Sequence, residues 1–357
     1  MQVLHLLARG GIGGIESLCV DIAKYSDDIN HFYFLWGGGS NAELIKQYTP
    51  NVVIRKFKNT SFIHEYRAFK DYIVNNSIDC IVVQGMSPMM LIFVRILKKC
   101  KPQVKSVLYL HANAEDLFQR KWVGKLFSIV YNSADGCIAI SKSVKDSVKN
   151  ICKRNIVRVI YNGTDCNKFL YKDKVFEHSK IKMIFVGRLI KKKGLDLLIN
   201  ALSLISEDFE LIVVGEGEEK NNLVELSNFL NLSDKIKFVG KQMNINEWIL
   251  EADLFVHPAV WKEGFGISLI ESMACGVPCV AFKNGAIPEI ITDNINGYLV
   301  DEISIEALAK RIEEVFWQRR NRVNEFMAIS KAARERAEEF NVQRYVKELS
   351  SYLNNLD

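Results

Sequence analysis

The stretch WKEGFGISLIESMACGVPCVAF, residues 261–282, carries the local signals from which we assign the fold. Its middle predicts a helix from about Phe265 to Gly276, and PCVAF (278–282) predicts a short buried strand. Glu263 would then lie in the loop before the helix, and Glu271 about two turns into it. Eight residues span about 2.2 turns, so both carboxylates would face the same side at different depths. They suit hydrogen bonds from hydroxyl groups better than acid and base roles.

Beyond this stretch, β-rich runs alternate with helix-like segments along the whole chain, which predicts doubly wound parallel sheets of the α/β class. A chain of 357 residues is too long for one core, so we expect two Rossmann-like domains, 1–165 and 166–341, facing an interdomain cleft. The polar stretch 164–182 is the predicted linker. The amphipathic segment 342–356 predicts a last helix, about 342–357, that could cap either domain, including a return to the first.

Ligands of such sheets bind at the carboxyl ends of the strands, so the residues that follow each strand are the candidate site residues. The strands expected in the first domain are 2–8, 31–36, 51–57, 79–84, 104–111, 136–140 and 157–162. Those expected in the second domain are 182–188, 209–217, 235–240, 252–258 and 278–282.

Composition narrows the class of protein. The chain is 48% hydrophobic and 25% charged, as in a soluble globular protein, and no apolar run reaches the ~20 residues of a spanning helix, so we expect a cytoplasmic protein. Eight cysteines without a C-x-x-C pair predict reduced core thiols and argue against a disulfide framework or a zinc site.

The net charge is +5, with the excess of Lys and Arg in the first half. This excess fits either a solvated surface or attraction to an anionic membrane or substrate.

The first strand leads into RGGIGGIESLCVDIA, a glycine-rich turn before a helix, where backbone N–H groups can approach an anion. A dinucleotide-binding fingerprint fails here, because Glu16 stands where the third glycine would be. The second strand ends in WGGG and lacks the acidic residue that holds a ribose. These departures argue against a nicotinamide or flavin enzyme and leave a phosphate site or a plain turn.

The second domain opens with FVGRLIKKKGLDLLI, in which Arg188 ends a strand and Lys193 precedes the glycine at a helix start. A forked guanidinium and an ammonium could converge there on a diphosphate. The alternative is that these cations, like Lys191 and Lys192, form a solvated surface.

Several motifs together resemble one known family. EGFGISLIE is an E-x7-E motif, and it occurs with GRLIKKKG, VGEGEEK, ADLFVHPAVWKEGFG and ESMACGVPCVA. In the first half, GGIGGIE, LYLHAN and VRVIYNGTDCNKF also match. With these motifs the chain resembles the retaining glycosyltransferases of the GT-B fold, family 4, over essentially its whole length.

The resemblance implies roles for individual residues. Arg188 and Lys193 would bind the donor diphosphate, Glu263 would hold donor-sugar hydroxyls, and His111 would contact the sugar near the reacting carbon. Glu271 would hold the nucleotide ribose. The remaining donor-binding residues implied are Gly13, Gly14, Gly215, Glu216, Val239, Phe265, Gly266 and Ile267. On position alone, His111 could instead be a structural histidine, and His257, before Pro258, would shape a turn.

The implied reaction is transfer of a hexose or N-acetylhexosamine from a nucleotide-diphosphate sugar, with UDP-sugar preferred, to an acceptor hydroxyl with retention. The departing diphosphate would help to deprotonate the acceptor. The sequence contains no Asp-x-Asp pair, so we expect no metal and no other cofactor.

The acceptor implied is a lipid-linked or cell-envelope glycan intermediate of capsule, O-antigen or exopolysaccharide synthesis. Segments 89–105 and 118–131 join apolar residues to Lys and Arg, which is typical of interfacial helices but also of helices with one buried face. Peripheral docking at the inner face of the cytoplasmic membrane is therefore a hypothesis.

Other functions stay open. A sugar phosphorylase or nucleotide-sugar epimerase could use the same fold. A noncatalytic subunit could bind nucleotide sugar or support a polysaccharide complex. Nucleic acid is not an expected partner, because the basic residues lack aromatic interleaving and no recognition module is visible.

Overall fold

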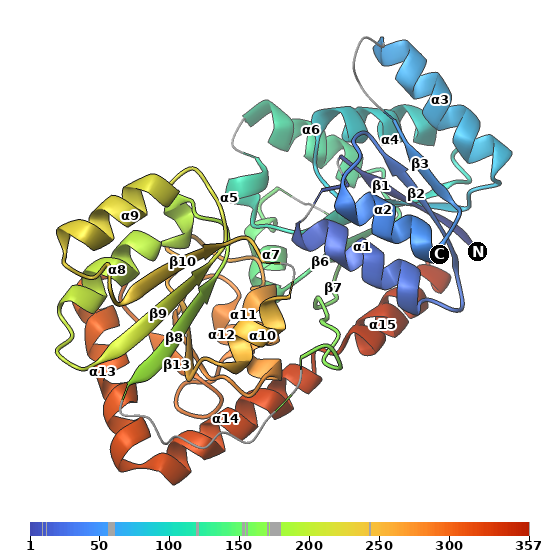
Figure 1. Cartoon of the computed structure of the whole chain (residues 1–357). Helices are drawn as coiled ribbons and strands as arrows, with labels where there is room; N and C mark the ends of the chain where they lie inside the picture. The colour runs from blue at the N-terminus through green and yellow to red at the C-terminus, as the bar shows by residue number, and fades with distance from the viewer. Residues whose placement is uncertain are drawn as a thin grey trace. The chain divides into compact units, whose positions relative to one another are not determined.

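The computed structural model describes residues 1–8, 10–11, 13–55, 61–118, 121–151, 154, 156–169, 171, 180–242 and 244–356. The chain divides into two compact units (Figure 1). The first unit is Met1–Gly163 together with Val342–Asp357, and the second is Thr164–Asn341. Each unit is an α/β structure built on a parallel sheet, as the alternating pattern predicts.

The described part of the first unit holds a seven-stranded sheet in the order β3-β2-β1-β4-β5-β6-β7. Its strands are mostly apolar, since helices cover both faces of a parallel sheet, and all four residues of β4 are buried. The strands are β1 (Gln2–Leu7), β2 (Asn30–Leu35), β3 (Val52–Ile54), β4 (Cys80–Val83), β5 (Lys105–Leu110), β6 (Gly136–Ala139) and β7 (Val157–Val159).

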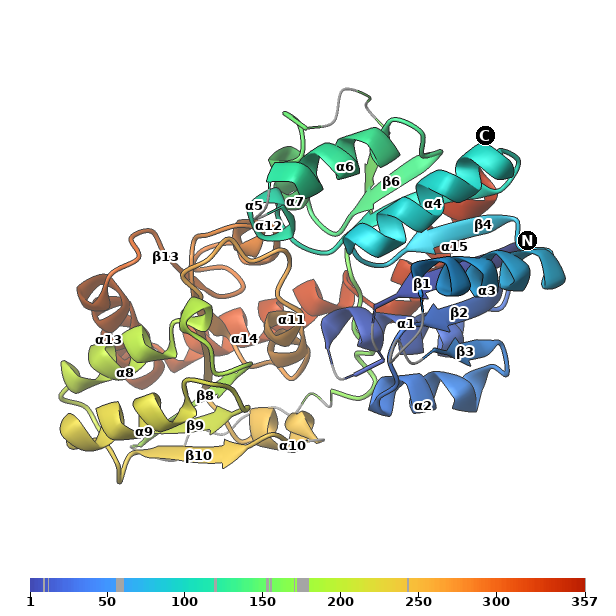
Figure 2. The same ribbon diagram turned by 90° about the horizontal axis from the view of Figure 1, so that it is seen from above.

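The last helix of the chain belongs to this first unit. It lies beside α1 on one side of the sheet, and α4 covers the other side (Figures 1 and 2). The helices of this unit are α1 (Gly14–Tyr25), α2 (Ser40–Tyr48), α3 (Phe62–Asn75), α4 (Pro88–Cys100), α5 (Ala114–Leu117), α6 (Lys121–Tyr131), α7 (Lys142–Ser147) and α15 (Val342–Asn354).

The described part of the second unit holds a six-stranded parallel sheet in the order β10-β9-β8-β11-β12-β13. The strands are β8 (Ile181–Val186), β9 (Phe209–Val214), β10 (Ile236–Gly240), β11 (Leu254–His257), β12 (Cys279–Phe282) and β13 (Tyr298–Val300). The helical segments are η1 (Lys191–Lys193), α8 (Leu195–Ser203), α9 (Lys220–Phe229), α10 (Ile245–Leu250), α11 (Ile267–Ala274), α12 (Ile287–Ile290), α13 (Ile305–Asn321) and α14 (Val323–Glu338).

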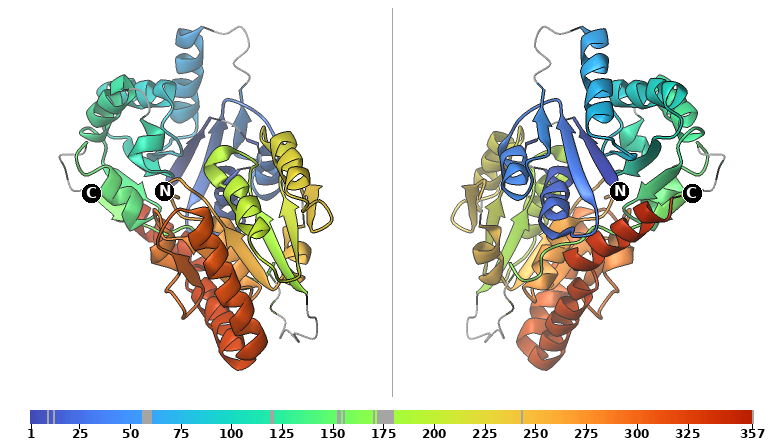
Figure 3. Two further views of the ribbon diagram at one scale, coloured as in Figure 1. Left: turned by 90° about the vertical axis from the view of Figure 1, so that its left-hand side faces the viewer. Right: turned by 90° about the vertical axis from the view of Figure 1, so that its right-hand side faces the viewer.

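Helices of the second unit pack on its sheet through buried apolar side chains. Residues of α8 and α13 share one core with the strands, including Leu198, Ile199, Ile312 and Phe316. The long helices α13 and α14, orange to red in Figure 3, lie side by side, and α14 also packs against α11.

All the strands predicted from the sequence are present, but several predictions were wrong at the ends. Predicted strand 209–217 ends at Val214, because Gly215 turns the chain with φ +149°. Arg188 does not end a strand, since β8 stops at Val186 and Arg188 lies in the following loop. The predicted linker 164–182 includes the first residues of β8, and its positions 170 and 172–179 lie outside the described residues. Strand β13 was not predicted from the sequence.

The described cysteines are free thiols. Six are buried and Cys100 is exposed, while Cys152 lies outside the described residues. In the part of the chain that the structure describes, no helix is long and apolar enough to cross a membrane.

Candidate active site

In the second sheet, the direction in which the chain adds strands reverses between β8 and β11. From β8 the chain moves to β9 and β10 on one side, then returns to β11 on the other. At such a switch point the loops after the two strands diverge and leave room for a ligand. The loop after β8 carries the exposed Arg188 and the half-buried Lys193, and the loop after β11 carries Glu263.

The loop after β8 lies directly against the loop after β11. Gly194 has φ +67°, and a Cβ there would lie 2.0 Å from the carbonyl oxygen of Pro258, so only glycine fits. The backbone N–H of Val260 donates to the carbonyl of Lys192 at 3.1 Å. This contact places Lys193 beside the Glu263 loop.

Three donors converge on a single oxygen, Oε2 of Glu263. The ammonium of Lys193 lies 2.7 Å away, the indole N–H of Trp261 donates at 3.2 Å, and Nε2 of His257 lies at 3.3 Å. The side chains of Lys193 and Glu263 are only 16% and 13% exposed, so water screens this ion pair little. Lys192 lies over the Trp261 ring, 4.8 Å from its centroid, which adds a second cation to the cluster.

The cluster keeps Glu263 ionised. Burial alone would raise the pKa of Glu263, but the hydrogen bond from His257 and the charge of Lys193 outweigh burial and hold that pKa well below its usual 4.5. Burial lowers the pKa of His257, so its ring is neutral and donates to the carboxylate through Nε2–H.

The loop after β12 holds the Glu263 backbone. The N–H of Ala286 donates to the Glu263 carbonyl at 2.9 Å, and the side chain of Asn284 donates to the carbonyl of Val260 at 3.0 Å. Between them Gly285 has φ +59°, and a Cβ on it would lie 2.4 Å from the Glu263 carbonyl oxygen. The loop after β12 therefore holds the backbone from which the Glu263 side chain extends.

Helix α11 begins two residues later than predicted, at Ile267, because Gly266 caps it with φ +98°. Glu271 therefore lies about one turn into the helix and not two. Phe265 is buried, with its ring edge-on to Phe340 at 5.5 Å, and thereby anchors the chain before the helix. The first backbone N–H groups of an α-helix have no carbonyl one turn earlier in the helix to bind, so those of α11 can donate to an anionic ligand.

Backbone hydrogen bonds connect the loop after β9 with the end of β10 and with the loop after β8. The N–H of Gly215 donates to the carbonyl of Gly240 at 2.9 Å, and that of Leu189 to the carbonyl of Glu216 at 3.0 Å. Val239 lies in β10, next to this contact. The Glu216 carboxylate pairs with Lys220 at 2.9 Å and is half exposed.

Gly13, Gly14 and His111 belong to the first unit. Gly13 is the N-cap of α1 with an extended backbone, and Gly14 is the first helical residue. His111 follows β5, and its Nε2 lies 2.8 Å from Oε1 of Gln84, which follows β4. Burial lowers the pKa of His111 to about 3.

Sequence reasoning missed two members of the Glu263 cluster. His257 does more than shape a turn, because it is 2% exposed and contacts Glu263. Trp261 was quoted in the opening stretch without a role. The available signal was position, since His257 ends the strand that Trp261 and Glu263 follow. Among the described residues, no group of three or more His, Cys, Asp or Glu side chains could hold a metal ion.

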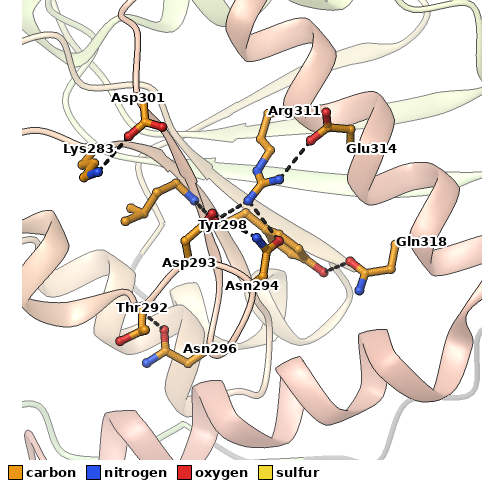
Figure 4. Close-up of polar contacts among 11 residues, drawn as sticks. Lys283, Thr292, Asp293, Asn294, Asn296, Tyr298, Asp301, Arg311, Glu314 and Gln318 are labelled. Atoms are coloured by element: carbon orange, nitrogen blue, oxygen red, sulfur yellow. Dashed lines mark hydrogen bonds and ion pairs between the residues drawn. The ribbon is translucent and has the colours of Figure 1, made fainter.

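An open hollow of about 690 Å³ lies elsewhere in the second unit, between α13, α14 and the loop after α12. Figure 4 shows that several polar residues of its wall pair with one another or with neighbouring residues. Arg311 contacts Asp293, Asn294 and Glu314, and Tyr298 donates to Gln318 at 2.8 Å. The hollow is lined by none of the predicted site residues.

Comparison with known families accounts for both units. Residues 12–168 match the family model "Glycosyltransferase Family 4", and residues 168–336 match "Glycosyl transferases group 1". The chain belongs to the family 4 glycosyltransferases. Except for the first two residues of GGIGGIE, Gly10 and Gly11, the motifs from which the resemblance was inferred lie within these two matches. The predicted GT-B fold class is confirmed.

Individual relatives of this glycosyltransferase agree with the family. An uncharacterized glycosyltransferase of Methanocaldococcus jannaschii is 28% identical over 309 residues, 85% of each chain. A Campylobacter jejuni enzyme named N-acetylgalactosamine-N,N'-diacetylbacillosaminyl-diphospho-undecaprenol 4-alpha-N-acetylgalactosaminyltransferase is 32% identical over 203 residues. That match covers 55% of this chain and 53% of the relative. The crystal structure of Anabaena HepE in complex with UDP superposes with a TM-score of 0.88, at 23% identity and over the full length of both chains.

Proposed function

We propose that this glycosyltransferase moves a hexose or N-acetylhexosamine from a nucleotide-diphosphate sugar to an acceptor hydroxyl, with retention at the anomeric carbon. The observation that carries the proposal is the buried cluster on Glu263, where a lysine ammonium, an imidazole and an indole converge on one carboxylate oxygen at a strand switch point. A carboxylate kept ionised in this way is a strong acceptor for sugar hydroxyls.

In the proposed donor complex, positive groups receive the diphosphate. Arg188 and Lys193 bind its oxygens, and the first N–H groups of α11 add the positive end of the helix dipole. The charge that develops on the leaving diphosphate is stabilised by these groups, which are already in place before the reaction. Glu263 accepts donor-sugar hydroxyls, and Glu271 accepts the ribose hydroxyls.

The departing diphosphate takes the proton of the acceptor hydroxyl, so no side chain of this chain is assigned as a general base. No metal is required in this scheme, because the cations of the loop after β8 balance the leaving group. EDTA-treated protein is expected to keep its activity, and the product is expected to have the anomeric configuration of the donor.

UDP-sugar is the preferred donor, with support from a structural neighbour of the same fold that was crystallised with UDP. A lipid-linked or envelope glycan is the proposed acceptor, with support from the Campylobacter relative, whose name includes a diphospho-undecaprenol substrate. Both assignments are specific enough to be tested with pure compounds.

We also propose that helix α6 docks on an anionic membrane surface. Trp122 and Ile129 are 50% and 45% exposed, and they lie seven residues apart on the helix face that also carries Lys125. In α4, by contrast, the apolar residues Met90, Leu91, Phe93, Val94 and Leu97 are buried, so that helix supplies core packing.

A thermal-shift screen tests the donor assignment. The full chain is titrated with UDP, GDP, ADP and TDP and with matched sugar nucleotides, alongside Arg188→Ala and Glu271→Ala. We expect selective stabilisation by one nucleotide, lost in both variants and kept in Glu302→Ala and Arg320→Ala, two exposed positions away from the loop after β8. No shift with any nucleotide would favour a noncatalytic subunit that supports a polysaccharide complex without binding nucleotide. Sugar release by inorganic phosphate alone would favour a phosphorylase.

A further inference from the structure

A chain of hydrogen bonds crosses the sheet of the first unit from β2 to the residue after β5. His111 Nε2 lies 2.8 Å from Gln84 Oε1, and Gln84 Nε2 lies 2.9 Å from His5 Nδ1. His5 Nε2 lies 2.8 Å from His31 Nδ1, and His31 Nε2 lies 2.9 Å from Ser26 Oγ. The strands concerned, β2, β1, β4 and β5, are neighbours in the sheet, so each link spans one strand spacing.

The middle of this chain is fully enclosed. His5, Gln84 and His31 are 0%, 3% and 6% exposed, and the ring of His5 stacks on Tyr33 with centroids 5.1 Å apart. Burial lowers the pKa of His5 well below its ordinary value and that of His31 to about 4. Both rings are therefore neutral at physiological pH, and each offers one N–H and one lone pair.

Neutral rings make the directions of the bonds depend on one another. Gln84 Oε1 only accepts, so His111 must donate from Nε2–H. The Gln84 amide N–H then donates to the lone pair of His5 Nδ1, which leaves the His5 proton on Nε2. His5 in turn donates to His31 Nδ1, and His31 donates from Nε2–H to Ser26. In this arrangement every hydrogen bond has one donor and one acceptor, and all the bonds run in the same direction, from His111 towards Ser26.

A Gln84 amide turned by 180° would reverse all the links. His111 would then accept at Nε2 and carry its proton on Nδ1, as would His5 and His31. The orientation of one buried amide thus determines whether His111 offers a ligand a lone pair or an N–H.

We propose that Gln84 and His5, supported by His31, are positioning residues that hold His111 as the Nε2–H tautomer, so that its Nδ1 accepts a hydrogen bond from a ligand hydroxyl. This inference rests on the proposed function in one respect, which is that the ligand hydroxyl belongs to the donor sugar. The tautomer itself does not depend on that function.

The tautomers can be read directly by nuclear magnetic resonance. Full-length protein labelled with ¹⁵N-histidine gives long-range ¹H–¹⁵N correlations that distinguish Nε2–H from Nδ1–H rings, and His5→Gln, His31→Gln and His111→Gln assign the signals. We expect the Nε2–H tautomer for His5, His31 and His111. An Nδ1–H tautomer, or averaging between tautomers, at His111 in the unmodified protein would overturn the proposal.

Kinetic measurements test whether this chain of hydrogen bonds acts through His111. Gln84→Met removes both links at similar volume, and we expect kcat/KM for the nucleotide sugar to fall about tenfold in the unmodified background. In a His111→Ala background the same change should alter kcat/KM less than twofold, because the residue it positions is gone. An equal loss in both backgrounds would refute the positioning role.

Gln84→Glu separates positioning from simple packing. Its carboxylate still accepts from His111 Nε2–H but forces His5 to present Nδ1–H, so we expect His111 to keep its tautomer and kcat/KM to exceed that of Gln84→Met. His64→Gln, at an exposed histidine, is the matched control and should change neither readout. Equal kcat/KM for the two Gln84 variants would count against the proposal. If no nucleotide sugar is turned over, the proposed function fails, and the NMR result still decides the tautomer.

Discussion

At the scale of single residues, Glu263 shows how burial and charge together determine a protonation state. Burial alone would raise the pKa of its carboxyl group, but the contacts with His257 and Lys193 outweigh burial and keep it ionised. Trp261 donates to the same oxygen. An exposed pair in the same unit, Glu216 with Lys220, has a similar distance of 2.9 Å but lies in water. The two ion pairs should therefore contribute differently to the free energy of unfolding.

We predict that Glu263→Gln lowers the free energy of unfolding by about 1–3 kcal/mol, because Lys193 keeps its charge with only a neutral acceptor beside it. Glu216→Gln should change it by less than about 0.5 kcal/mol. Urea unfolding at pH 7 measures both. Equal effects of the two substitutions would show that the buried cluster contributes no more than a surface pair.

The buried histidines predict a loss of stability in mild acid. His31 has a folded pKa of about 4 against 6.5 when unfolded, so between these values only the unfolded chain takes up the proton. The contribution of His31 to the free energy of unfolding is complete above pH 6.5, and it falls by about 3 kcal/mol as the pH drops towards 4. The pKa of Glu263 is lowered from 4.5, so its own loss begins only below that pH.

The measurement is the free energy of unfolding at pH 7 and at pH 5. We expect His31→Gln to reduce the difference between the two pH values, because it removes a buried proton acceptor. His64→Gln, on the surface, should leave the difference unchanged. A His31→Gln protein with the same pH dependence as the unmodified chain would contradict this explanation.

At the scale of elements, the turn between η1 and α8 brings the loop after β8 against the residue that follows β11. The carbonyl of Pro258, just after β11, occupies the space that a side chain on Gly194 would need. This approach places the last residue of η1 next to Glu263, so the element boundary and the ion pair depend on the same glycine.

We predict that Gly194→Ala destabilises the protein by at least about 1 kcal/mol and weakens nucleotide binding, since it combines a positive φ with a steric clash. Gly124→Ala is the matched control. Gly124 lies inside α6, where a Cβ would meet Phe118 at an ordinary 3.6 Å, so alanine should stabilise the helix by up to about 1 kcal/mol. Thermal unfolding with and without UDP measures both effects, and an unaltered Gly194→Ala protein would refute the proposed constraint.

At the scale of the whole molecule, the exposed face of α6 predicts binding to anionic vesicles. We expect Trp122→Ser with Ile129→Ser to reduce co-sedimentation with phosphatidylglycerol vesicles at least fivefold, because both the aromatic and the aliphatic contact are lost. Trp317→Ser is the control, since Trp317 is equally exposed but lies on α13 in the other unit. Unchanged sedimentation of the double variant would exclude α6 as the docking element.

Much of the fold could be predicted because its signals are local. Buried parallel strands appear as continuous apolar runs, so β1, β4 and β8 were located to within one or two residues. Strand β13 was not predicted, and the start of α11 was misplaced because the φ of Gly266 cannot be read from the sequence. The roles of Arg188, Glu271 and the glycine loop remain predictions.

The sequence by itself determined the two-unit α/β architecture and the family, because hydrophobic alternation and motif spacing are properties of neighbouring residues. Only the tertiary structure decided which side chains meet. Lys193 and Glu263 are 70 residues apart in the chain, and His5 and Gln84 are 79 apart. Their contacts depend on strand order and on the close approach of backbones at Gly194 and Gly285. Burial then decided the protonation states, since the pKa of a carboxylate or an imidazole depends on solvent access and on partners distant in sequence.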